Sequence, residues 1–231
     1  MHSLPDLKTI EMFRTWRTDA ARCLPVALDI ARSHGLPHAD PLLFSTGTNL
    51  VVALNDGLIL KIFPPLLRSQ FVSERISLSQ LRGRLGNAIP EIVLEGERDQ
   101  WPYLVITRLQ GILGTQAWPI LPEDQKERVL GQIGETIAEV QGVPVGELSS
   151  IEPRWDQFMR QQIEGCRARH ERLGLPRKYL DGLDELLSDA AALVPMDAPP
   201  VILTGEYIPE NFLLSREGAT WRLSGAQHAC V

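Results

Sequence analysis

The spacing of hydrophobic positions changes along the chain, from a strand-rich first part to a mainly helical second part. Two apolar runs, residues 50–54 and 58–63, flank Asn55-Asp56-Gly57. Asp-Gly between two such runs predicts an antiparallel hairpin. A third run over residues 103–109 leads into Gln110-Gly111, which indicates a connector leaving a β-sheet.

Helical periodicity predicts most of the remaining chain. Apolar residues at steps of three and four predict helices over residues 9–34, 67–85, 123–141, 155–170 and 179–194. Short strands are expected at residues 201–203, 211–214 and 221–223. The pattern therefore indicates an α+β fold, with a β-rich N-terminal lobe over residues 1–110 and a helical C-terminal lobe over residues 111–231.

Composition excludes several classes of protein. A net charge of −6 provides no basic surface for a nucleic-acid backbone, so no nucleic-acid partner is expected. No apolar run approaches the roughly 20 residues that span a bilayer, and the N-terminus is too charged for a signal peptide. We expect a cytoplasmic protein without a membrane partner, and the sequence leaves its oligomeric state open.

Two charged residues occupy apolar elements. Lys61 lies in the second hairpin strand, and Glu74 lies in the apolar stripe of the following predicted helix. Burying either charge alone is costly, which favours a mutual ion pair. The alternative is that both long side chains reach solvent independently.

A small polar turn precedes the hairpin. It consists of Ser45, Thr46, Gly47, Thr48 and Asn49, whose backbone N–H groups are able to approach phosphates. Taken alone, this composition is more often that of an ordinary loop.

The order of these features resembles the kinase fold, and the chain resembles the aminoglycoside and hygromycin B phosphotransferases over Phe44 to roughly Ser224. The resemblance is carried by STGTNLVVALNDGLILKIF at residues 45–63, the helix with Glu74, WPYLVITRLQG at 101–111, AEVQ at 138–141 and LTGEYIPENFLL at 203–214. It implies a protein-kinase-like two-lobe fold and an ATP- and Mg²⁺-dependent transfer of a phosphoryl group to a hydroxyl of a small molecule, such as an aminoglycoside antibiotic.

The resemblance also implies a role for each site residue. Lys61 would bind the α- and β-phosphates and Glu74 would orient it, with the turn at residues 45–49 close to the phosphates. The backbone from Thr107 to Leu109 would receive the adenine. Glu206 would be the catalytic acid, and Asn211 would act in catalysis as a magnesium ligand.

The sequence departs from the family pattern at two places. Thr204-Gly205-Glu206 stands where the family usually has His-Gly-Asp, and the added methylene of Glu206 displaces its carboxylate. His228 stands where a metal-binding aspartate is expected, and imidazole is a poor magnesium ligand. The abrupt change at Ala226 suggests a truncated or altered C-terminus that lacks the last helices.

Three functions are therefore distinguished. The first is an active small-molecule kinase. The second is a catalytically impaired nucleotide-binding protein that keeps the kinase fold. A structural or interaction protein is third, because such a role does not explain Lys61 and Glu74 in apolar elements.

Overall fold

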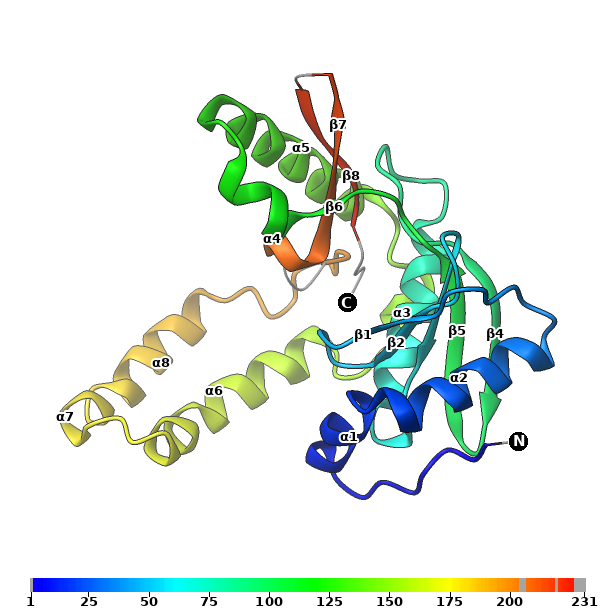
Figure 1. Ribbon diagram of the computed structural model, residues 1–231. Coiled ribbons are helices and arrows are strands. Elements are labelled where there is room, and N and C mark those ends of the chain that lie inside the picture. Colours follow the sequence, from blue (N-terminus) through cyan, green and yellow to red (C-terminus); the bar gives the residue numbers. More distant parts are fainter. Residues whose placement is uncertain (1, 204–206, 219, 227–231) are drawn as a thin grey trace. The chain divides into compact units, whose positions relative to one another are not determined.

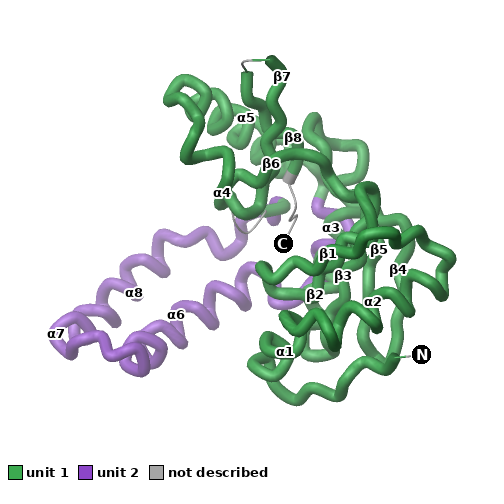
Figure 2. The backbone as a smooth tube through the Cα atoms, in the orientation of Figure 1, with its two compact units in different colours: residues 1–144, 202–231 green, residues 145–201 purple. Residues whose placement is uncertain are grey.

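The computed structural model describes residues 2–203, 207–218 and 220–226, and the chain divides into two compact units (Figures 1 and 2). The first unit consists of Met1–Pro144 with Ile202–Val231, and the second of Val145–Val201. The predicted lobe boundary near Gln110 stays a prediction. Among the described helices, none combines the length and apolarity that a bilayer crossing requires.

A five-stranded antiparallel sheet forms the first part of unit 1, with the strand order β1-β2-β3-β5-β4. Its strands are β1 (Leu42–Phe44), β2 (Leu50–Ala53), β3 (Leu58–Ile62), β4 (Ile92–Arg98) and β5 (Trp101–Thr107). The predicted hairpin is confirmed as β2 and β3, since Val52 pairs with Leu60 across it. The Asn55 side chain accepts hydrogen bonds from the N–H groups of Gly57 and Leu58 and thereby fixes the turn.

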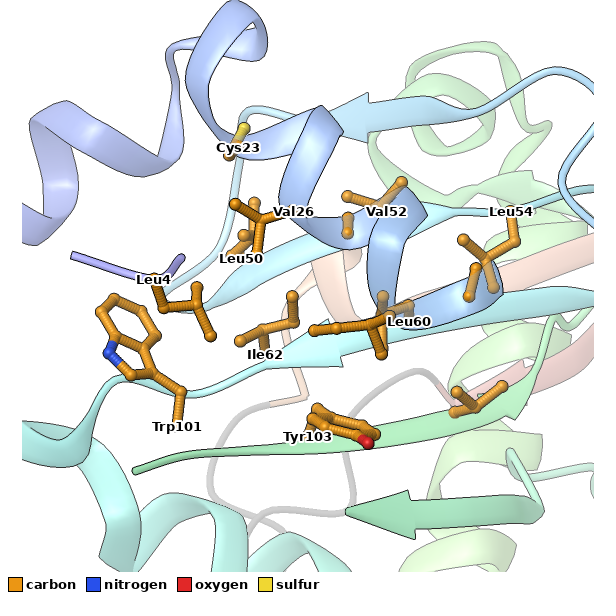
Figure 3. Close-up of a cluster of buried hydrophobic side chains, with 14 of the residues drawn as sticks. Leu4, Cys23, Val26, Leu50, Val52, Leu54, Leu60, Ile62, Trp101 and Tyr103 are labelled. Carbon is orange, nitrogen blue, oxygen red and sulfur yellow. The ribbon is translucent and has the colours of Figure 1, made fainter. Parts of the chain in front are cut away.

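Helices cover both faces of this sheet. The helices α1 (Ile10–Arg17) and α2 (Ala20–Ser33) pack on one face through a cluster that joins Phe13, Trp16 and Val26 to strand residues. Figure 3 shows part of this cluster, with Val26 and the strand residues Leu50, Leu60 and Ile62 labelled. Side chains alternate along a strand, so Leu60 and Ile62 point into this cluster while Lys61 points to the opposite face. That face carries α3 (Arg68–Leu81).

The single helix predicted over residues 9–34 is wrong, because the chain breaks between α1 and α2. Thr18 ends α1, and the Asp19 carboxylate caps α2 by accepting a hydrogen bond from the N–H of Ala21. The local capping preference of Asp19 outweighs the continuous apolar periodicity. The break separates α1 from α2, and residues of both helices pack on the sheet.

A second sheet within unit 1 has three antiparallel strands in the order β6-β7-β8. These are β6 (Ile112–Leu113), β7 (Phe212–Glu217) and β8 (Thr220–Ala226), and α5 (Glu123–Gly142) packs against them through Val129 and Ile133. Between β6 and α5 lie α4 (Gly114–Ala117) and the 3₁₀ turn η2 (Trp118–Ile120). The β7–β8 pair confirms two of the three short strands predicted near the C-terminus, whereas residues 201–203 are not a strand.

Unit 2 is helical. It contains α6 (Trp155–Arg172), α7 (Arg177–Leu180) and α8 (Leu183–Leu193), so the helix predicted over residues 179–194 is divided in two. Asp184 binds Arg167 at 2.7 Å and ties α8 to α6. Together the two sheets and their helices confirm the predicted α+β fold class.

The packing of the N-terminal helices gives a stability test. Phe13 has no exposed surface, and its ring lies 5.8 Å from that of Trp101. Phe13→Ala should lower the free energy of unfolding by about 3–5 kcal/mol, because it removes a buried ring and leaves a cavity. Met12→Ala, on the exposed side of the same helix, should change it by less than about 0.5 kcal/mol in urea denaturation. Equal effects would show that α1 does not depend on this packing.

Candidate functional site

The centre of the candidate site is a buried ion pair between the first sheet and α3. The Nζ atom of Lys61 lies 2.5 Å from Oε2 of Glu74, and each side chain is only 5% exposed. Lys61 is held between Val51 and Leu104 in the sheet register. The sequence-based prediction that the two charges satisfy each other is confirmed, and the alternative of two solvent-facing charges is excluded.

Aromatic rings line the lysine. Its Nζ atom lies 5.5 Å from the centroid of the Phe63 ring, which packs edge-on against Phe71 of α3. A cation over a ring face gains electrostatic attraction from the π electrons. The lysine is therefore held by a carboxylate and by a ring.

A second polar link joins the turn before β2 to α3, one helical turn away from Glu74. Asn49 is 4% exposed, and its Nδ2 donates to Oε1 of Gln70 at 3.2 Å. Gln70 precedes Glu74 by four residues, so both project from the same side of α3. The sequence analysis missed Gln70, although its spacing from Glu74 was a usable signal. The buried Oδ1 of Asn49 has no hydrogen-bond partner among the described residues.

The predicted phosphate turn connects β1 to β2. Its first four residues, Ser45 to Thr48, are exposed, and Gly47 has a φ of 85°, in the left-handed region that favours glycine. The Thr46 carbonyl accepts a hydrogen bond from Nη1 of Arg17 at 3.4 Å. Asn49, the last residue of the turn, is therefore buried, while the four residues before it are exposed to solvent. The contact from Arg17 of α1 was not predicted from the sequence.

The connector after β5 is tied to the β2–β3 turn by backbone and side-chain hydrogen bonds. The N–H of Arg108 donates to the Gly57 carbonyl at 2.8 Å, and the Gln110 side chain donates to the Asp56 carbonyl at 2.7 Å. The N–H of Thr107 is also occupied, by the Glu91 carbonyl. Within the described part of the chain, the N–H of Leu109 has no such partner, so it is free to donate to a ligand.

The same connector packs against β8. An added Cβ on Gly225 would stand 2.7 Å from Cδ1 of Leu109, and one on Gly111 would stand 2.7 Å from Oγ of Ser224. A Cβ on Gly225 would also stand 2.9 Å from the Ala88 carbonyl oxygen, and one on Gly111 would stand 2.9 Å from Cβ of Leu213, so a larger residue at either position would force its neighbours to shift. The close approach fixes the connector between the two sheets.

Asn211 ends the short 3₁₀ turn η4 (Pro209–Asn211) immediately before β7. The β7 strand pairs with β6, which follows the connector, through Leu213 and Leu113. An amide oxygen such as that of Asn211 is a ligand that Mg²⁺ accepts. The described residues hold no cluster of three or more His, Cys, Asp or Glu side chains suited to a metal, and Glu206 and His228 lie outside them.

The buried pair gives a second stability test. Glu74→Ala should cost about 3–5 kcal/mol of unfolding free energy, because it leaves Lys61 charged, buried and unpaired. Lys61→Met combined with Glu74→Leu should recover most of that loss, since no charge stays buried. The control is Glu97→Ala, which breaks the exposed pair with Arg68 and should cost less than about 1 kcal/mol in urea denaturation. Failure of the double variant to recover stability would contradict the role of the unpaired charge.

Comparison with known proteins agrees with this geometry. Residues 41–226 match the family described as "Phosphotransferase enzyme family". No curated protein matches the chain. The GDP complex of a mutant aminoglycoside 2'-phosphotransferase-IIIa is 21% identical, with a TM-score of 0.72 over 89% of this chain and 71% of that one.

Two further solved structures are similar. The ternary complex of APH(2'')-IIa with streptomycin and ATP is 14% identical, with a TM-score of 0.65 over 90% of this chain and 70% of that one. A thermostable mutant of aminoglycoside phosphotransferase APH(4)-Ia with ADP and hygromycin B is 16% identical, with a TM-score of 0.59 over 88% and 70%. These likenesses confirm the predicted kinase-like fold. Because the family match covers most of the chain, the protein belongs to the phosphotransferase enzyme family.

Proposed function

We propose that the protein transfers the γ-phosphoryl group of ATP to a hydroxyl group of a small molecule, of which an aminoglycoside is the leading candidate. The observation that carries this proposal is the buried Lys61–Glu74 pair, set within the residues that match the family. A fold stabilised for its own sake gains little from such a pair, since apolar residues of similar volume serve as well. Binding of phosphate by a lysine that Glu74 holds in position would explain why the pair is buried here.

Three groups of described residues support a nucleotide site. Lys61 would hold the α- and β-phosphates, with Glu74 fixing its position. The turn from Ser45 to Asn49 would present backbone N–H groups to the phosphates. The free N–H of Leu109 would donate to the adenine.

The transfer itself needs groups at the acceptor. The acceptor hydroxyl oxygen would attack the γ-phosphorus as the bond from that phosphorus to the β–γ bridging oxygen breaks. The hydroxyl proton would pass to the carboxylate of Glu206, and ADP would leave. Asn211 would contribute one oxygen ligand to Mg²⁺, which in such enzymes neutralises charge on the phosphates.

The acceptor class is proposed from the solved structures that share the fold. Streptomycin, gentamicin and hygromycin B are bound in three of them. These ligands are cationic and rich in hydroxyl groups, and the net charge of −6 favours a cationic acceptor. An aminoglycoside panel is therefore the first set of acceptors to test, with both ATP and GTP as donors.

Substitutions at the proposed site test the transfer. Lys61→Ala should lower kcat/KM by about 100-fold or more, because a positioned charge on the phosphates is lost. Glu206→Ala should lower kcat, whereas Glu206→Asp, which restores the family's usual aspartate, should raise it, since a misplacement of about 1 Å can cost on the order of 100-fold. Radiolabelled phosphate transfer to the panel measures both effects.

The outcomes separate the candidate functions. Transfer by the wild type that is lost in Lys61→Ala supports the kinase. ATP binding without transfer, in the wild type and in Glu206→Asp alike, supports the impaired nucleotide-binding protein. Absence of both leaves only a structural role for the fold.

The base contact has its own test. Leu109→Pro removes the free N–H and should weaken ATP binding about tenfold, the worth of roughly one hydrogen bond in a desolvated site. Leu109→Ala keeps the N–H and should bind ATP within about threefold of the wild type. Calorimetric titration of both variants, with melting curves to verify folding, makes the comparison. Equal affinity in the proline variant would remove Leu109 from the site.

A further inference from the structure

Arg17 stands out among the buried charges of unit 1. It is the last residue of α1 and is only 9% exposed, yet it forms no ion pair with any carboxylate of the described residues. Its Nε is buried without a hydrogen-bond partner, and its Nη1 has a single acceptor, the Thr46 carbonyl at 3.4 Å. The residue also precedes the family match, which begins at residue 41.

Such an arrangement is costly for the protein alone. A buried cation needs an opposite charge or a full set of acceptors to offset the loss of hydration. Burial and the neighbouring Arg14 both lower the pKa of Arg17, but a guanidinium keeps its proton at neutral pH. Arg17 is therefore charged, and no carboxylate within residues 2–203, 207–218 and 220–226 pairs with it.

The arginine is held rigidly in this position. Trp16, the preceding residue, packs on Trp101 with ring centroids 5.4 Å apart. The Cys23 thiol, from α2, donates to the Arg17 carbonyl at 3.6 Å. Both contacts anchor the C-terminal end of α1, from which the guanidinium reaches the turn.

The contact with Thr46 also orients the turn. In a trans peptide the C=O and the following N–H point in opposite directions. With the Thr46 carbonyl turned to Arg17, the N–H of Gly47 is directed away from Arg17, to the other side of the turn. Arg17 thus supports the turn from the sheet face that carries α1 and α2.

We propose that Arg17 is a positioning residue for nucleotide binding, which fixes the Ser45–Asn49 turn through the Thr46 carbonyl and adds positive charge beneath a polyphosphate. This inference rests on the proposed function. The ligand class is a nucleoside di- or triphosphate, because a neutral nucleoside gains nothing from the charge. The guanidinium would act on the polyphosphate across the turn, through its positive charge, since its direct contact is with the Thr46 carbonyl.

The test compares ligands that differ in phosphate charge. Arg17→Met, Arg17→Lys and the exposed control Arg14→Met are titrated with ATP, ADP and adenosine, and each apoprotein is melted. Arg17→Met should weaken ATP binding about tenfold, the loss of one charge-assisted interaction, and ADP binding by less, with adenosine unchanged. Arg17→Lys, which keeps charge and donor, should lie between, and Arg14→Met should stay within about twofold of the wild type.

Stability distinguishes a positioning residue from a structural one. Arg17→Met should melt at or above the wild-type temperature, because it removes an unpaired buried charge. A lower melting temperature with equal losses for ATP and adenosine makes Arg17 structural and overturns the inference. If Arg17→Met binds ATP with wild-type affinity, the inference about Arg17 is wrong but the proposed function stands. If the wild-type protein binds no nucleotide, both the inference and the proposed function are wrong.

Discussion

The contact on which the candidate site depends is the ion pair between Lys61 and Glu74. It joins the middle of a sheet to the middle of a helix at a place where neither charge reaches water. The pair also restricts the positions of strand and helix, because separating the two residues would leave each as a buried unpaired charge. The strand and the helix must therefore keep their relative position, and the parallel link from Asn49 to Gln70 reinforces it one turn away.

The rest of unit 1 extends this fixed centre. On one side, α1 and α2 close the opposite face of the sheet and bring Arg17 beneath the polar turn. On the other, the connector at Leu109–Gly111 passes against β8 at distances at which a larger residue at position 111 or 225 would force its neighbours to shift. The residues proposed to hold phosphate and base thus belong to one continuous packing arrangement. Asn211 lies in the turn η4, immediately before β7 of the second sheet, and the connector joins that sheet to the first.

Local sequence patterns predicted the parts of this arrangement that local physics controls. The hairpin followed from Asp56-Gly57 between apolar runs, and the ion pair followed from charges in apolar stripes. Local capping also corrected one prediction, because Asp19 interrupts a helix that periodicity alone would continue. Contacts between residues far apart in the sequence were not predicted. Arg17 and Thr46 are 29 positions apart, and neither residue type in its local pattern indicates the other. The role of Glu206 rests on the resemblance, since it lies outside the described residues.

The hydrogen bonds between the β2–β3 turn and the connector have a consequence for how such a protein changes over evolution. Arg108 and Gln110 bind the carbonyls of Gly57 and Asp56, so the hairpin with Lys61 and the strand end with Leu109 form one rigid frame. Substitutions elsewhere then leave the spacing between the lysine and the free backbone N–H unchanged. Under the proposed function, the contacts to the nucleotide would therefore keep their spacing while the residues around the acceptor change.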